Sequence, residues 1–171
     1  VIVIGGGNTA IDVAVLSKKL GAEDVTLAYR RGPEQMSATW KEQEFAQTNG
    51  VRVKHWVAPK SLQSENGHVC GIAFECTELN PEGKLVGTGE LRNMEADIVF
   101  KAIGQTLVNS LDSATEMPET TGGKIAVNSK YETSLAGVWA GGDCIRSGED
   151  LTVQAVEDGK QAALAIHRKL T

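Results

Sequence analysis

The amino-acid sequence predicts an α/β fold built around a parallel β-sheet. Residues 1–4 form an unbroken run of valine and isoleucine, which is typical of a strand buried on both faces of such a sheet. A glycine-rich turn follows, and residues 10–20 then carry apolar side chains at helical spacing until Gly21, a residue type that often ends helices. A second apolar run at 25–29 completes a strand–helix–strand unit. We therefore predict a Rossmann-like, three-layer domain.

The turn between the first strand and the helix fits the pattern G-x-G-x-x-A of dinucleotide-binding folds. In that pattern Gly5 makes the tight turn, Gly7 lets the backbone approach a pyrophosphate, and Ala10 lets the helix pack on the strand. Unpaired N–H groups at the helix N-terminus attract the anion. The alternative is a glycine-rich turn in another kind of α/β domain. The residues predicted to bind the dinucleotide here are Gly5, Gly6, Gly7, Asn8 and Thr9.

The end of the second strand indicates which dinucleotide is bound. An NAD site usually carries Asp or Glu about twenty residues after the motif, where it binds the ribose 2′-OH. This chain has Tyr29-Arg30-Arg31 instead, and two guanidinium groups suit a 2′-phosphate that they can hold bidentately. We predict NADPH in preference to NADH, with Arg30 and Arg31 at the adenosine end. The alternative is an exposed basic turn.

Composition excludes several classes of protein. The 171 residues are 41% hydrophobic and 23% charged, which is ordinary for a globular chain. A net charge of −5 without a long basic run argues against a nucleic-acid partner. No apolar run has the length of a membrane span and no signal peptide is present, so we expect a cytoplasmic protein with no membrane partner. Because the sequence begins inside a core strand without methionine, we expect a piece of a longer protein.

The cysteines and histidines predict neither a metal site nor a catalytic group. Cys70, Cys76 and Cys144 have no metal-ligand spacing and form no C-x-x-C pair. Cys70 and Cys76 alternate with Ile72 and Phe74 in a predicted strand, so we interpret them as small buried side chains in a reducing cytoplasm. The three histidines are scattered along the chain, and no nucleophile, general acid or general base is predicted.

The middle of the chain alternates between helical and extended patterns. Thr39 and Glu42 fit a capping box that opens a short helix ending near Gly50. Residues 51–57 predict a strand that ends before Pro59. An antiparallel meander that covers one face of the parallel sheet is then predicted from three extended segments separated by turns, at residues 61–65, 68–79 and 85–94.

Residues 96–104 return to the pattern of a buried parallel strand. The strand ends in Ala102, Ile103 and Gly104, which we place at the carboxyl edge of the sheet, where ligands bind in open α/β folds. Residues 105–121 are polar and irregular, so the domain boundary is expected here. This boundary divides the chain into residues 1–105 and 106–171.

The last third of the chain contains a second candidate site. After a short predicted strand at 124–127, residues 138–143 place Asp143 just past another strand and behind two glycines that allow close backbone approach. There Asp143 is expected to accept hydrogen bonds from a polyol hydroxyl. A flexible turn at 146–150 precedes a helix from about Thr152 to Leu170, whose Gly159 we attribute to close packing. The apolar stripe of this helix is Val153, Val156, Ala163, Ile166 and Leu170.

Five stretches of the chain carry a resemblance to known proteins: VIVIGGGNTA, LGAEDVTLAYRR, ADIVFKAIGQ, TSLAGVWAGGD and DLTVQAVEDGKQAALAIHRKL. They resemble flavoproteins of the pyridine nucleotide-disulphide oxidoreductase type, and the resemblance covers nearly the whole chain. More narrowly, they resemble the small chain of glutamate synthase and the NAD(P)H-oxidising part of dihydropyrimidine dehydrogenase. TSLAGVWAGGD is similar to the second FAD signature of that superfamily. This implies that Asp143 binds the FAD ribitol and that Leu151, Thr152 and Val153 lie by the isoalloxazine ring. Gly142 is also predicted to lie at the cofactor.

The resemblance also implies a separate role for each part of the chain. Residues 1–105 would be an NAD(P)H-binding domain, and residues 106–171 would be the C-terminal segment of a discontinuous FAD-binding domain. The protein would be an electron-input module that passes hydride from NAD(P)H to FAD. Electrons would continue through iron–sulfur clusters, in an upstream part or a partner, to a catalytic large subunit or domain. The ending VEDGKQAALAIHRKL favours the dihydropyrimidine dehydrogenase type over the glutamate synthase small chain.

Two further interpretations stay open at this point. One is a non-catalytic dinucleotide sensor, which would have no need of the second cofactor signature. The other is a structural or degenerate relative that holds neither cofactor, which a titration with NADPH would distinguish. We also expect the isolated chain to be inactive, to lack bound flavin and to self-associate through the apolar stripe of its last helix.

Overall fold

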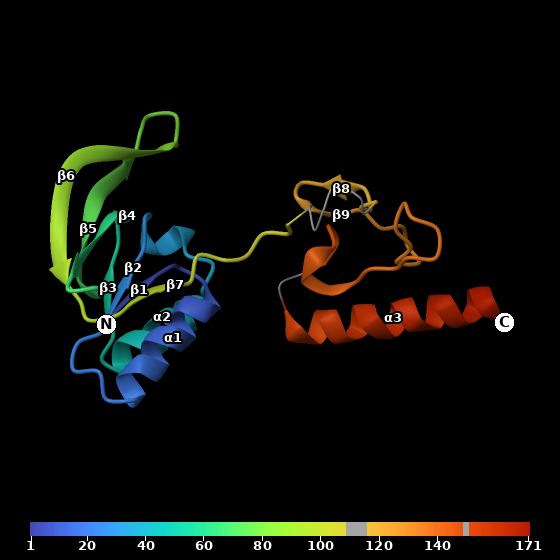
Figure 1. Ribbon diagram of the computed structural model, residues 1–171, viewed down its shortest axis with the longest axis horizontal. Helices are drawn as coiled ribbons and strands as arrows, with labels where there is room; N and C mark the ends of the chain where they lie inside the picture. The colour runs from blue at the N-terminus through green and yellow to red at the C-terminus, as the bar shows by residue number, and fades with distance from the viewer. Residues whose placement is uncertain (109–115, 149–150) are drawn as a thin grey trace. The chain divides into compact units, whose positions relative to one another are not determined.

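The computed structural model describes residues 1–108, 116–148 and 151–171. The chain divides into two compact units, Val1–Gly104 and Gln105–Thr171, and each is described by itself (Figure 1). Parts of the predicted irregular segment at 105–121 and of the turn at 146–150 lie outside the described residues.

The first unit contains the predicted parallel sheet. Strand β1 (Ile2–Ile4) leads into helix α1 (Asn8–Lys19), which returns to β2 (Thr26–Ala28). Strands β3 (Arg52–Lys54) and β7 (Val99–Lys101) complete a four-stranded sheet in the order β3-β2-β1-β7, in which every neighbouring pair is parallel. The predicted buried strand at 96–104 is only these three residues, and Phe100 is 41% exposed, because β7 is an edge of this sheet.

Helices α1 and α2 (Trp40–Thr48) cover one face of the parallel sheet. The side chains that α1 buries are Ala10, Ile11, Ala14 and Val15. Leu16 and Leu20, the last apolar residues of the predicted helical pattern, are exposed. The capping box of α2 is confirmed: Thr39 Oγ1 accepts from the Glu42 backbone N–H at 3.4 Å, and Glu42 Oε2 accepts from the Thr39 N–H at 2.6 Å.

Strands β4 (Val57–Glu65), β5 (His68–Leu79) and β6 (Leu85–Glu95) form the predicted antiparallel meander. The prediction of one strand at 51–57 is wrong, because β3 ends at Lys54 and the chain turns at Trp56, whose φ is +61°. Val57 therefore begins the meander. Pro59 lies inside β4, where the pairing shifts register; this is tolerated because β4 is an edge strand and proline has no N–H to donate.

The meander packs on the second face of the parallel sheet, which confirms the three-layer prediction. Ile2 and Ala28 of the parallel sheet share a buried cluster with Ile72 and Phe74 of β5, and Figure 1 shows the meander and the helices on opposite sides. Within β5 the contact is made by the middle of the strand, and Val57 of β4 and Met94 of β6 join the same cluster. Cys70 is consequently exposed, which contradicts its assignment as a buried side chain, and Cys76 is half-buried.

The second unit has little regular structure before its helix. It contains a two-stranded ribbon of β8 (Thr120–Thr121) and β9 (Lys124–Ile125), the short 3₁₀ turn η2 (Gly142–Cys144) and helix α3 (Thr152–Leu170). The bounds of α3 agree with the prediction. The strand predicted before Asp143 is instead an irregular segment with one isolated bridge, between Glu132 and Trp139.

The buried face of α3 differs from the predicted stripe. Val153 is 77% exposed and Val156 is 68% exposed, whereas Asp158 and Ala162 are buried. Gly159 has no neighbouring atom within 4 Å of the position of a Cβ, so close packing does not explain it in this structure.

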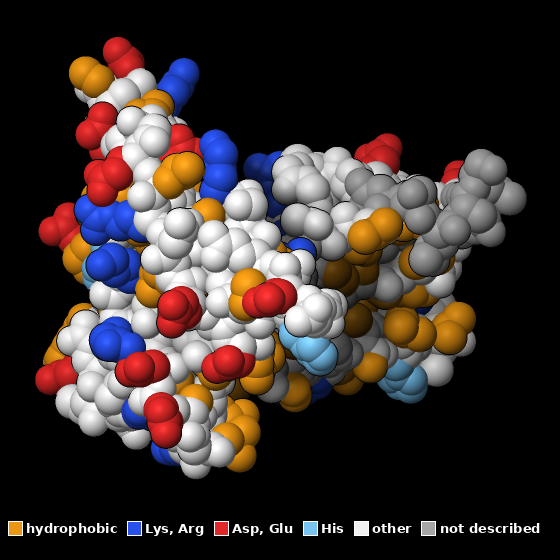
Figure 2. Space-filling view, turned by 60° about the vertical axis from the view of Figure 1, so that its left-hand side comes forward, with side chains coloured by type: hydrophobic (Ala, Val, Ile, Leu, Met, Phe, Trp, Pro, Cys, Tyr) orange, Lys and Arg blue, Asp and Glu red, His pale blue; other side chains and the backbone are white. Residues whose placement is uncertain are grey.

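Exposed hydrophobic side chains appear among interspersed acidic and basic ones in Figure 2. Within the described part of the chain, no helix is long and apolar enough to cross a membrane.

Candidate functional site

The carboxyl edge of the parallel sheet brings together three groups of predicted residues. The strand register aligns Ile4 with Ala28 and with Lys101, so the segments that follow these strands emerge side by side. Gly5 N donates to the Ala28 carbonyl oxygen at 3.0 Å, and Ala102 N donates to the Ile4 carbonyl oxygen at 2.8 Å. The residues gathered at this edge are Gly5, Gly6, Gly7, Asn8 and Thr9, with Arg30, Arg31, Ala102, Ile103 and Gly104.

Two of the three glycines are required by the packing of the chain itself. Gly5 has φ of +154°, and a Cβ at this position would collide with the Ala102 carbonyl oxygen and approach the Ala10 Cβ to 2.9 Å. A Cβ on Gly6 would lie 2.5 Å from the ring of Tyr29. Both residues are buried. Their side-chain-free backbone lets strand, helix and the neighbouring strand ends meet in one turn.

Gly7 is different, because the packing of the chain does not require it. Its φ of −104° and ψ of 179° are extended values that any residue adopts. A Cβ there would have only the Ser37 Oγ within 4 Å, at 3.0 Å. The position is also the N-cap of α1, and no side chain caps the helix. Asn8 and Thr9 are exposed, so the first N–H groups of α1 are open to an anion from outside, and the site fits a diphosphate.

A short segment after β2 lies against the glycine turn. Ala38 N donates to the Gly6 carbonyl oxygen at 3.0 Å, and the Tyr29 hydroxyl donates to the Gln35 carbonyl oxygen at 2.5 Å. This segment brings the exposed Ser37 hydroxyl to the Gly7 position. Sequence reasoning missed Ser37, since it belongs to no motif and only the fold returns it to the turn.

Hydrogen bonds to the backbone carbonyl groups of the two arginines fix the main chain at the end of β2, and the charged side chains are not used in these bonds. Thr77 Oγ1 donates to the Arg30 carbonyl oxygen at 2.8 Å, and Trp56 N donates to the Arg31 carbonyl oxygen at 3.3 Å. Arg30 is exposed and Arg31 is half-buried. Among the described residues, neither guanidinium forms an ion pair with a carboxylate. The pair therefore suits a phosphate group at the end of β2.

The second unit contains the other predicted residues. Gly142 has φ of +78°, and a Cβ on it would lie 3.3 Å from the Ala155 Cβ of α3. Asp143 follows in η2 and is exposed. The start of α3 is exposed as well, over the predicted residues Leu151, Thr152 and Val153. The unit thus offers an exposed carboxylate on a glycine turn that contacts α3, which fits a polyol ligand.

Asp158 of α3 was not among the predicted residues. It is 1% exposed, and its Oδ2 accepts from the Gly142 N–H at 2.9 Å. Its Oδ1 accepts from Gln154 Nε2 at 2.7 Å and from the Tyr131 hydroxyl at 3.0 Å. These bonds, that from Gly142 foremost, outweigh burial and hold the pKa of Asp158 below its usual value. The available signal was its helical spacing from two alanines, Ala155 and Ala162, on the inward face.

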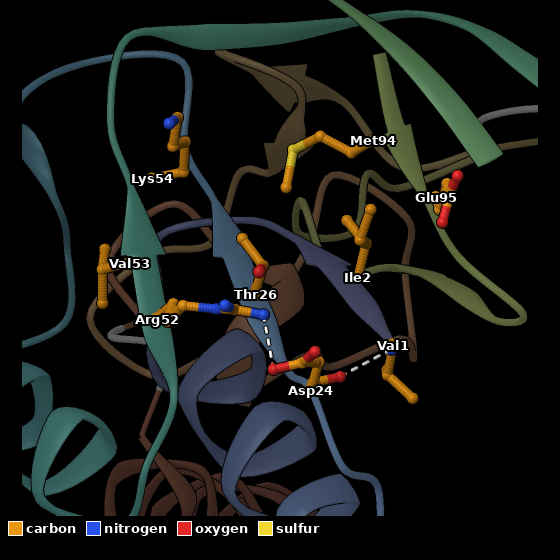
Figure 3. A pocket seen from close by; sticks show the side chains of 9 residues that line it. All are labelled: Val1, Ile2, Asp24, Thr26, Arg52, Val53, Lys54, Met94 and Glu95. Carbon is orange, nitrogen blue, oxygen red and sulfur yellow. Dashed lines mark hydrogen bonds and ion pairs between the residues drawn. The ribbon is translucent and has the colours of Figure 1, made fainter. Parts of the chain in front are cut away.

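A cavity of about 380 Å³ lies at the opposite, amino edge of the parallel sheet (Figure 3). Asp24 and Arg52 face each other there in an ion pair of 2.5 Å, and the Val1 amino group donates to the Asp24 carbonyl oxygen at 2.8 Å. The predicted binding residues do not line this cavity. Asp24, Arg52 and the Val1 amino group bind one another there, and we do not include this cavity in the candidate site.

The family model for pyridine nucleotide-disulphide oxidoreductases matches residues 1–159, and the chain belongs to this family. Membership implies a part in binding NAD(P)H and FAD. The glycine turn and the exposed Asp143 are consistent with that implication.

Individual relatives match nearly the whole chain. The small chain of NADPH glutamate synthase from Escherichia coli is 34% identical over 95% of this chain and 37% of its own length. The beta subunit of the NADP(+)-dependent formate dehydrogenase of Moorella thermoacetica is 34% identical over 99% of this chain and 25% of its own length. The chain therefore spans between a quarter and two fifths of these relatives.

Solved structures show the same fold. Thioredoxin reductase of T. acidophilum superposes with a TM-score of 0.83 at 21% identity, covering 98% of this chain and 51% of that one. The thioredoxin reductase of Lactococcus lactis gives 0.79 at 22% identity, with the same coverage of both chains. The present chain has no C-x-x-C pair, and its cysteines are free.

Proposed function

We propose that this chain is the electron-input module of an NADPH-dependent flavoprotein oxidoreductase. The observation that carries the proposal is Gly7: its backbone conformation suits any residue and its surroundings nearly accommodate a methyl group, yet the helix N-terminus behind it is open. A glycine that the chain itself does not require is explained by the approach of a ligand phosphate.

Each group of residues then has a part in binding. The first N–H groups of α1, at Asn8 and Thr9, hold the diphosphate, and the two arginines hold the 2′-phosphate. Asp143 accepts from hydroxyls of the flavin side chain, and Gly142 forms the tight turn against α3 that precedes it. Nicotinamide and flavin, when bound, supply the hydride transfer, and the protein supplies orientation. The groups at the reacting rings are Ala102, Ile103 and Gly104 for the nucleotide and Leu151, Thr152 and Val153 for the flavin.

The names of the relatives support the choice of nucleotide and the presence of a partner. Glutamate synthase is named for NADPH and the formate dehydrogenase for NADP(+), and the two matching chains are a small chain and a beta subunit. We infer that electrons leave through iron–sulfur clusters to a catalytic large subunit or domain in the cytoplasm. The dihydropyrimidine dehydrogenase type, favoured by the C-terminal sequence, stays a prediction beside the glutamate synthase type.

The substitution Gly7→Ala tests the proposal in the complete protein. The added methyl group occupies the space of the ligand phosphate while requiring only a small shift of Ser37. We expect NADPH affinity to fall about tenfold or more, equivalent to ~1.4 kcal/mol, with the melting temperature little changed. The measurement is calorimetric titration with NADPH, followed by anaerobic reduction of the flavin monitored by its visible absorbance.

Gly159→Ala is the matched control, because Gly159 lies in the second unit with open space around it. NADPH affinity should be the same as in the native protein. Native affinity in Gly7→Ala would contradict the nucleotide site. NADPH binding without flavin reduction in the native protein would favour the dinucleotide sensor instead.

A further inference from the structure

The buried Asp158 carboxylate joins α3 to the turn that carries Asp143. A buried charge is costly unless donors surround it, and here three donors converge on two oxygens. Two of them, from Tyr131 and Gln154, occupy Oδ1. The third donor is the backbone N–H of Gly142, which donates to Oδ2. Gly142 is the residue immediately before Asp143.

Gly142 is restrained from three further directions. Ala155 lies against its α-carbon, where a Cβ would be 3.3 Å away, and Ile145 N donates to its carbonyl oxygen at 3.1 Å. Gly148 lies so close to the same carbonyl oxygen that a Cβ on Gly148 would collide with it. The peptide before Asp143 is therefore fixed, while Asp143 itself is exposed.

We infer that Asp158 is a positioning residue: it holds the Gly142 turn in the geometry that presents the Asp143 carboxylate to the hydroxyls of a flavin side chain. The inference rests on the proposed function, in which Asp143 is the ligand-binding group. A carboxylate on a short irregular turn has no neighbouring strand to orient it, because the segment before Asp143 forms no regular sheet. The bond to Asp158 supplies that orientation from a rigid helix.

Substitutions of Asp158 can separate the effect of its hydrogen bonds from the effect of its negative charge. An aspartate accepts all three hydrogen bonds, whereas alanine accepts none. Asparagine keeps one oxygen for the Gly142 N–H, and its NH₂ can donate to Gln154 if that amide turns and to the Tyr131 oxygen. Asp158→Asn should therefore restore most of the binding that Asp158→Ala loses.

The test is a double-mutant cycle in the complete protein, stripped of flavin and titrated with FAD. We expect Asp158→Ala to weaken FAD binding about tenfold when Asp143 is present and no more than about twofold when Asp143 is already alanine, since the two residues act on one ligand contact. Asp158→Asn should lose no more than about threefold. Glu157→Ala is the control, because Glu157 is exposed and pairs with Lys160 and Gln161 on its own helix.

Each outcome decides the question. Equal losses from Asp158→Ala in both backgrounds would mean that Asp158 only stabilises the fold, which overturns the inference. Unchanged FAD affinity in Asp143→Ala would overturn the flavin part of the proposed function, and the inference with it. If Asp158→Ala does not fold, Asp158→Asn carries the test: its smaller loss must disappear in the Asp143→Ala background, and a loss that persists there overturns the inference.

Discussion

At the end of β2, Arg30 and Arg31 stand where an NAD-binding domain usually has a carboxylate. We expect the double substitution Arg30→Ala/Arg31→Ala to weaken NADPH binding by about 2–4 kcal/mol, because two charge-assisted hydrogen bonds to the 2′-phosphate are lost. NADH, which has no 2′-phosphate, should bind with nearly unchanged affinity. Calorimetric titration with both nucleotides measures the difference.

Arg52→Ala provides the control for this experiment. Arg52 lies at the other edge of the sheet in an ion pair with Asp24, so its loss should affect the two nucleotides equally and slightly. If Arg30→Ala/Arg31→Ala reduced NADPH and NADH affinity by the same factor, the assignment of these arginines to a 2′-phosphate would be wrong.

A second residue-scale prediction concerns His55, which follows β3. Its Nε2 is buried without a hydrogen-bond partner in the described structure, and burial lowers the pKa of the imidazole below the usual 6.5. The unfolded chain therefore binds a proton at higher pH than the folded chain does. The free energy of unfolding should fall as the pH drops through 6.5 toward the lower folded pKa, and it should be unaffected by this group above pH ~7.5.

Thermal unfolding between pH ~7.5 and ~5 checks this expectation. His55→Phe should remove the corresponding part of the pH dependence. His68→Gln, a substitution of the exposed histidine at the start of β5, should leave it in place. A pH dependence identical in His55→Phe and the native chain would show that His55 does not contribute.

At the scale of elements, α3 contains a glycine that its surroundings do not require. Gly159 lies in mid-helix with open space around it. Gly159→Ala should stabilise the second unit by about 0.5–1 kcal/mol, because alanine loses less backbone entropy in a helix. Gly142→Ala should have the opposite effect, since φ at Gly142 is +78° and the Ala155 Cβ lies close. Denaturant titration measures the change in the free energy of unfolding for each variant. A lower free energy of unfolding in Gly159→Ala would contradict the prediction, because it would indicate close packing around this residue.

At the scale of the whole molecule, the exposed apolar residues of α3 predict association. Val153 and Val156 are mostly exposed, and apolar surface in water is unfavourable by about 25 cal/mol per Å². We expect the isolated chain to form a two-fold dimer through this helix at high concentration. Val153→Ser/Val156→Ser should shift it toward the monomer, whereas Leu62→Ser, at an exposed apolar position of β4, should not. Sedimentation velocity distinguishes these cases, and a native chain that stays monomeric would refute the prediction.

The sequence by itself determined those parts of the molecule that depend on local signals. The apolar run of β1, the glycine turn and the helical spacing of α1 specified the strand–helix–strand unit and the edge where the predicted nucleotide-binding residues meet. The capping box of α2 and the length of α3 were equally readable. Such features could be predicted because caps, periodicity and turn residues act on the backbone nearby, whatever the rest of the chain does.

Only the tertiary structure decided which surfaces are buried and which distant residues support the sites. Helical spacing groups Leu16 with the buried side chains of α1, but burial depends on whether another element lies opposite, and here Leu16 is exposed. The break at Trp56 arises where the chain leaves one sheet for another. The fold also brings two distant residues to the candidate sites. Ser37 lies next to Gly7, 30 residues earlier in the chain. Asp158 accepts a hydrogen bond from Gly142, 16 residues earlier. No local pattern records a contact that forms only when the chain folds back on itself.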